Sequence, residues 1–151
     1  MLEALSQWRR VIRPNGLVLF SSFTDTAFRG LADIFKEDME AAGVDVAKMP
    51  LATTRLTDID VCSGLMSQAG YVNIKQTTLQ MGYHLPDENA WWDTVRGAAL
   101  RGFLALIPES SRTEFKQKHL ARISKMRTDE GIWTDVGVQL TLGQVPAEGS
   151  R

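Results

Sequence analysis

Hydrophobic positions at the start of the chain change from helical spacing to strand spacing within twenty residues. Leu2, Leu5 and Trp8 recur every three positions, which predicts a helix that ends in the segment 13–16, where Pro and Gly cannot continue it. Leu17–Phe20 follows and is apolar at every position. Such a run is typical of a parallel strand that is covered on both faces.

The remaining pattern alternates helices and strands. It predicts a polar loop over 21–27, helices over 28–42, 61–69, 86–103 and 111–126, and strands over 71–83 and 136–142. Ser111–Glu114 has capping-box spacing and marks the start of the last helix. The final strand alternates apolar with polar residues, which predicts one buried face. The sequence therefore predicts an α/β fold, followed by a flexible tail over 144–151.

Two segments carry a resemblance to a known family. Trp8–Phe20 reads W-R-R-V-I-R-P-N-G-L-V-L-F, similar to an R-V-L-K-P-G-G turn and a fifth strand, and Leu65–Tyr71 reads L-M-S-Q-A-G-Y, similar to an L-L-x-x-A-G-F sequence before a sixth strand. Gly131–Val136 looks like the start of a seventh. In these sequence motifs and in their order, residues 2–143 resemble the C-terminal half of class I S-adenosylmethionine-dependent methyltransferases, in particular the ubiquinone/menaquinone-biosynthesis-like (type 11) group.

The resemblance implies a specific architecture. Residues 1–143 would form the C-terminal part of a Rossmann-like methyltransferase sheet, with one parallel strand and an antiparallel final pair. A helical insertion over 86–127, between the last two strands, would form a substrate lid. The fourth strand of the family would normally flank Leu17–Phe20. Without it we expect an unpaired apolar edge, and self-association or strand exchange through that edge.

The donor-binding elements of the family have no counterpart in this sequence. Family members bind S-adenosyl-L-methionine mainly through a glycine-rich loop after the first strand, and the twelve glycines here form no G-x-G. We therefore expect a substrate-side portion that is inactive alone and takes the donor only in a completed enzyme. The alternatives are a non-enzymatic module that pairs with a partner chain through its sheet edge, and a stand-alone binder of small ligands.

Candidate residues for contact with a small-molecule acceptor come from two regions: Ser22, Phe23, Thr24, Tyr83, Trp92, Arg96 and Arg101. The first three follow a predicted parallel strand, where open α/β sheets place ligands. Alternatively this segment is an ordinary connection in which Thr24 or Asp25 caps the next helix. Trp92 and Arg96 are four residues apart, which suits a cation–π contact, or else the tryptophan is core and the arginines are solvated.

Other polar residues are expected to be structural. His84 follows Tyr83 and would face the same cleft or serve packing. His119 is expected to be packed or exposed rather than a base, and Cys62 to be an inert buried thiol. An acidic group on the helix over 28–42 and just beyond it is expected to be a solvated face without function: Glu37, Asp38, Glu40 and Asp45.

The composition mainly excludes certain classes of partner and site. The 17 basic and 18 acidic side chains leave no excess positive charge for nucleic acid. One cysteine and two histidines give neither a disulfide nor a spaced zinc cluster. The longest apolar runs fall far short of the roughly 20 residues that a membrane span needs, and the first residues do not form a secretory signal. We therefore expect a cytoplasmic protein without metal, nucleic acid or membrane.

Overall fold

The computed structural model describes residues 1–46, 56–97 and 100–147. It divides the chain into two compact units. Unit 1 comprises Met1–Asp25, Thr53–Gln80 and Gly137–Arg151, and unit 2 comprises Thr26–Ala52 and Met81–Val136. Each unit is thus assembled from segments that are far apart in the sequence.

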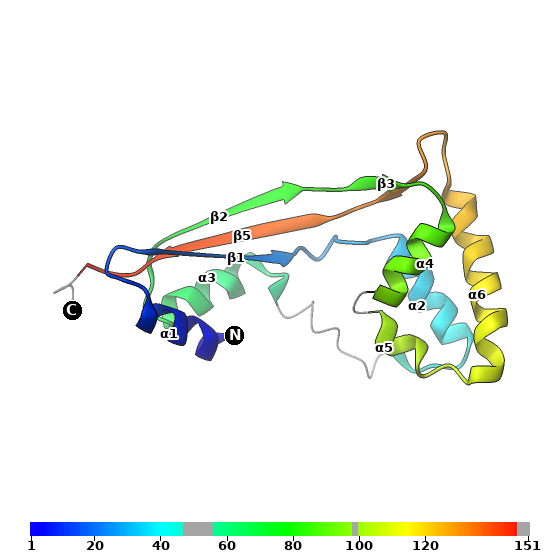
Figure 1. Cartoon of the computed structure of the whole chain (residues 1–151), viewed down its shortest axis with the longest axis horizontal. Helices are drawn as coiled ribbons and strands as arrows, with labels where there is room; N and C mark the ends of the chain where they lie inside the picture. The colour runs from blue at the N-terminus through cyan, green and yellow to red at the C-terminus, as the bar shows by residue number, and fades with distance from the viewer. Residues whose placement is uncertain (47–55, 98–99, 148–151) are drawn as a thin grey trace. The chain divides into compact units, whose positions relative to one another are not determined.

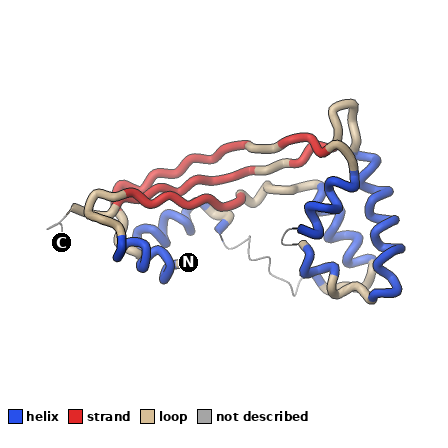
Figure 2. The backbone as a smooth tube through the Cα atoms, in the orientation of Figure 1, coloured by secondary structure: helices blue, strands red, loops and turns tan. Residues whose placement is uncertain are grey.

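Unit 1 is a three-stranded sheet with two helices on one face (Figures 1 and 2). Its elements are α1 (Leu2–Val11), β1 (Leu17–Phe23), α3 (Ile59–Gln68), β2 (Val72–Gln80) and β5 (Gly137–Gln144). The strand order is β1-β5-β2, and both outer strands are antiparallel to β5. Side chains of the helices and of the sheet pack together on the covered face in one apolar cluster: Leu5, Val18, Phe20, Cys62, Met66, Ala69, Tyr71 and Val145.

Local signals explain where α3 begins and ends. The Asp58 carboxylate accepts a hydrogen bond of 2.7 Å from the Asp60 backbone N–H and so caps the first turn. The helix stops at Gly70, whose φ of +81° is the left-handed conformation that glycine adopts most readily. Tyr71 follows, and its hydroxyl donates a 2.9 Å hydrogen bond to the Leu5 carbonyl. This bond joins the start of β2 to α1 across the buried core.

β1 differs from the sequence prediction in length, pairing and coverage. It continues through Phe23, although a loop was predicted from Ser21. It pairs antiparallel with β5, and the described residues contain no parallel strand pair. Only one face is covered, because Leu17 and Leu19 are 61% and 57% exposed. The predicted burial of β1 on both faces is therefore wrong, and β1 has no parallel partner among the described residues, whereas the antiparallel final pair of β2 and β5 is confirmed.

Unit 2 packs four α-helices with a short two-stranded sheet. Its elements are α2 (Leu31–Ala41), β3 (Tyr83–Leu85), α4 (Glu88–Gly97), α5 (Arg101–Leu104), α6 (Glu109–Ile123), the 3-10 helix Ser124–Met126 and β4 (Ile132–Thr134). Strands β3 and β4 pair antiparallel. The predicted insertion over 86–127 lies within this unit, together with α2. The core includes Leu31, Phe35, Met39, Trp91, Val95, Phe115, Ile123 and Ile132.

The structure corrects three predicted boundaries. The strand predicted over 71–83 is two strands, β2 in unit 1 and β3 in unit 2, and at Gly82 between them a Cβ atom would lie 2.4 Å from the Trp133 ring. Helix α6 begins two residues before the predicted capping box, after Pro108. The predicted tail starts too early, because Val145 is buried and its N–H donates to the Gly16 carbonyl at 2.8 Å. Residues 148–151 lie outside the described residues.

No helix among the described residues is both long enough and apolar enough to cross a membrane.

Candidate functional site

A group of polar atoms lies between the carboxyl end of β1 and α3, and we call it the Cys62 cluster: the side chains of Ser22, Cys62 and Gln139 and the backbone carbonyl of Leu56. Gln139 Nε2 donates to the Leu56 carbonyl at 2.9 Å and to Cys62 Sγ at 3.0 Å. The Cys62 thiol donates to the Leu56 carbonyl at 3.4 Å, and Ser22 Oγ lies 3.9 Å from the sulfur. The cluster therefore ties the segment that leads into α3 to the middle strand of the sheet.

The Cys62 cluster is buried and internally satisfied. Cys62 is fully buried and Gln139 is 2% exposed. The thiol contacts a carboxamide, a hydroxyl and a peptide carbonyl, and none of these groups is a base that would take its proton. The predicted burial of Cys62 is confirmed. Ser22 is half-buried and is the member of the cluster that comes from the predicted loop.

Phe23 and Thr24 continue the edge of the sheet. Phe23 is opposite Val138 on β5, and the Thr24 backbone N–H donates to the Gly137 carbonyl at 2.9 Å. Neither Thr24 nor Asp25 caps the next helix, because the N-cap of α2 is Gly30. The predicted cap at Thr24 or Asp25 is therefore wrong, and Ser22, Phe23 and Thr24 are consecutive residues at the carboxyl end of β1.

The four candidates in unit 2 have different surroundings. Trp92 is 8% exposed and packs beside Phe115, and the cation that lies over its ring, 5.6 Å from the centroid, is Lys116 rather than Arg96. Arg96 and Arg101 are exposed. Trp92 is therefore a core residue and both arginines are solvated, which is the second of the two interpretations given for them.

Tyr83 and His84 lie side by side on β3. Tyr83 is 51% exposed, and the His84 ring packs edge-on against Trp133 with centroids 5.0 Å apart. His84 Nε2 also lies 3.7 Å from a Glu130 carboxylate oxygen. The two-stranded sheet of β3 and β4 thus has exposed aromatic surface at Tyr83 and Trp133, whereas the His84 ring is held by its neighbours.

Unit 2 contains a buried hydrogen-bond network that the sequence prediction missed. His119 is fully buried; its Nε2 accepts a 2.9 Å hydrogen bond from Trp91 Nε1, and its Nδ1 lies 2.7 Å from Asp38 Oδ2. Indole N–H only donates, so the histidine is neutral with its proton on Nδ1, which donates to Asp38. Arg122 donates to the other Asp38 oxygen and to Glu37 at 2.6 Å.

This network corrects the expected role of the acidic group on α2. Asp38 is only 13% exposed at its side chain and is bound from two directions, so it does not belong to a solvated face. Its spacing carried a signal, because it lies seven positions after Leu31 and three after Phe35, both buried. Glu37 is exposed and pairs with Arg122.

Burial decides the protonation of His119. Desolvation lowers the pKa of His119 more than the hydrogen bond and charge of Asp38 raise it. Both ring nitrogens are occupied by protein partners, and the ring is stacked against Phe115 with centroids 5.9 Å apart. His119 therefore has a structural role and does not reach a substrate, as the prediction of a packed histidine indicated.

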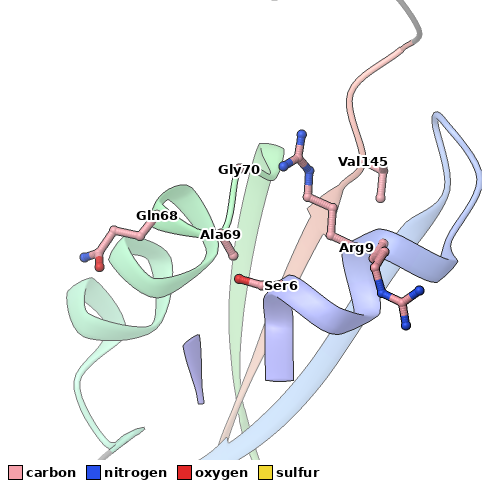
Figure 3. Close-up of a pocket in the computed structure, with 7 residues that line it drawn as sticks. Ser6, Arg9, Gln68, Ala69, Gly70 and Val145 are labelled. Atoms are coloured by element: carbon pink, nitrogen blue, oxygen red, sulfur yellow. The ribbon is translucent and has the colours of Figure 1, made fainter. Parts of the chain in front are cut away.

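A surface pocket of about 510 Å³ lies at the opposite end of the sheet (Figure 3). It is lined by Ser6, Arg9, Arg10, Gln68, Ala69, Gly70 and Val145. The carboxyl ends of α1 and α3 meet there, and their partial negative charge is balanced by the two arginines. Arg9 lies so close to Gly70 that a Cβ atom there would be 2.7 Å from Nη1. We assign this pocket to helix packing.

Comparison with known proteins does not place the chain in a family. No protein-family model matches the chain, and no curated protein shows significant similarity to it. Among the residues that the structure describes, no three His, Cys, Asp or Glu side chains are grouped as they would be to hold a metal ion.

Proposed function

We propose that the chain is the substrate-side portion of an S-adenosylmethionine-dependent small-molecule methyltransferase of the cytoplasm. One observation carries the proposal: β1 and β2 run in the same direction on the two sides of β5, and each follows a helix on the same face of the sheet. Helix–strand units of common direction build parallel α/β sheets, and such sheets accept a reversed strand near their edge. The reversed β5 is compatible with the antiparallel final pair that the methyltransferase resemblance implies.

The position of the inserted segments supports the same proposal. The chain leaves unit 1 after the carboxyl ends of β1 and β2 and returns at the start of β5, so the segments of unit 2 are connected to one end of the sheet. Ligands in open α/β sheets bind at the carboxyl ends of the strands. We assign the segment 86–127 to the substrate lid on this basis.

The chain's own residues would position the acceptor rather than perform chemistry. Ser22, Phe23 and Thr24 lie at the carboxyl end of β1, and exposed Tyr83 follows the carboxyl end of β2. Methyl transfer from a sulfonium is a displacement whose rate depends on alignment and exclusion of water. The exposed Arg96 and Arg101 would attract an anionic acceptor, whereas Trp92 supports the fold of the lid.

A thermal-shift titration with S-adenosylhomocysteine tests the proposal. The chain contains no G-x-G loop, so we expect no shift for the 151-residue chain alone. We expect a saturable shift, worth about 2.7 kcal/mol at 100 times the dissociation constant, for the native assembly purified through this chain from its source cells. A shift with the chain alone would contradict the division into donor and acceptor portions. An unresponsive native assembly would contradict the methyltransferase.

An assembly module without chemistry is the second candidate function. The open outer edge of β1 favours it, because within the described residues no strand pairs with that edge. The same titration separates the two candidates, since a pure assembly module binds its partner chain and gives no response to S-adenosylhomocysteine in any state.

A further inference from the structure

The two edges of the unit 1 sheet are built differently. β2 has the features that protect natural edge strands: a charge at Lys75, an irregular register between Val72 and Lys75, and a left-handed Asn73 with φ of 52°. β1 reads Leu-Val-Leu-Phe-Ser-Ser-Phe, with no charge, proline or glycine, and keeps an unbroken register with β5 over all seven residues. β1 therefore offers a regular template for another strand, and β2 does not.

Exposed apolar side chains lie both on β1 and on α1. Leu17 and Leu19 face away from the helices, beside the half-buried Leu142 of β5. On α1, Trp8 and Val11 are 40% and 69% exposed. Unit 1 thus exposes hydrophobic side chains on the strand and also on α1, whose Leu5 shares an apolar cluster with Val18 and Phe20.

We propose that β1 pairs antiparallel with β1 of a second copy of the chain, about a two-fold axis at Leu19. In this register Leu17 is opposite Ser21 of the second copy, Val18 is opposite Phe20, and the two Leu19 residues face each other. Odd positions pair only with odd positions, so both copies keep the same covered face. An uncharged strand complements itself, which favours a second copy over a partner of opposite charge.

The asymmetry of the edges limits the assembly to a dimer. Two-fold pairing of β1 with β1 joins two sheets into one of six strands, and its two outer edges are both the protected β2. An isologous contact of this kind is closed, whereas a β1-to-β2 contact would extend into a filament. We therefore expect dimers without larger oligomers.

The contact is small. The register pairs the five residues Leu17–Ser21 over a helix, which gives an edge about 17 Å long and about 15 Å deep, or roughly 250 Å² per copy, against about 800 Å² per partner in stable complexes. The dimer is therefore weak and dissociates in the micromolar range. It does not depend on the proposed function, although a donor-binding portion that added a strand to β1 would compete with it.

Sedimentation velocity of the full chain tests the pairing. Over loading concentrations from about 1 to 300 μM, we expect a reversible monomer–dimer equilibrium. Leu19→Lys places two like charges opposite each other and should raise the dissociation constant at least about tenfold. Leu79→Lys is the matched control, because Leu79 is an exposed leucine on the same face of the other edge strand; it should leave the equilibrium unchanged. Circular dichroism verifies that both variants fold.

A cysteine cross-link tests the register. Directly opposed residues in antiparallel strands have Cα atoms about 4.5–5.5 Å apart, which a disulfide spans. Mild oxidation should convert Leu19→Cys to a covalent dimer and leave Leu79→Cys monomeric, and the buried Cys62 does not interfere. A monomer at all concentrations would overturn the proposal, and so would equal loss of association in both lysine variants or equal cross-linking of both cysteine variants.

Discussion

Trp91→Ala lowers the free energy of unfolding of unit 2 by about 3–5 kcal/mol, the usual cost of truncating a fully buried tryptophan. Trp91 is 0% exposed. The substitution leaves a large cavity in the helical core and also removes the donor that satisfies His119 Nε2 at 2.9 Å. Urea unfolding followed by far-ultraviolet circular dichroism measures the loss. A chain that no longer folds at room temperature would be the upper limit of the same effect.

Trp133→Ala provides the matched control in the same unit. Trp133 is 46% exposed and packs on one side against His84. Because nearly half of the side chain is already exposed in the folded chain, we expect a smaller loss than for Trp91, about 1 kcal/mol. Equal losses in the two variants would show that the helical core is not organised around Trp91.

Acid destabilises unit 2 through His119. The folded-state pKa of His119 is lowered, mainly by burial, so the neutral form is the one that the fold accepts. Above the unfolded pKa of about 6.5 this contribution to stability is fully present. As the pH falls below 6.5 the unfolded chain binds a proton that the folded chain resists, and stability is lost by up to about 1.4 kcal/mol per pH unit, until the pH has passed the folded pKa.

His119→Gln identifies the group responsible. Glutamine is neutral at every pH in this range, so the variant should be less stable near pH 7.5 but should lose the histidine part of the slope between about pH 6.5 and 5. Urea midpoints measured at several pH values give both slopes. If stability falls equally with pH in the two proteins, the acid sensitivity comes from other groups. That result would contradict a neutral His119 with both ring nitrogens hydrogen-bonded.

Local signals made the helices of unit 1 predictable. Pro14 and Gly16 end α1, and Asp58 and Gly70 bound α3, because caps and left-handed turns act within a few residues. The alternation correctly predicted a strand at β5, but it predicted the wrong buried face: the buried odd positions include Gln139 and Thr141, whereas the apolar Val138, Leu140 and Leu142 are half-buried. The sequence was sufficient to predict an element wherever residues nearby in the chain determine where that element begins and ends.

Long-range partners explain what was missed. The apolar run at β1 indicates hydrophobic surroundings but not how many layers cover it, so the exposure of Leu17 and Leu19 had no local signal. Asp38 and His119 are 81 residues apart in the sequence and come into contact only in the folded chain. The candidate site was predictable to the same degree: the position of Ser22, Phe23 and Thr24 follows from β1, whereas the core packing of Trp92 depends on α6.

Hydrogen–deuterium exchange along β1 tests most directly the claim that this strand has an open edge, on which the assembly module and the dimer both depend. In dilute solution, where the chain is monomeric, we expect alternate amides of Leu17–Ser22 to exchange rapidly while the amides of β5, paired on both sides, stay protected. At high concentration the exposed β1 amides should become protected. Uniform protection of β1 in the monomer would show that its outer edge is already paired and would contradict the account.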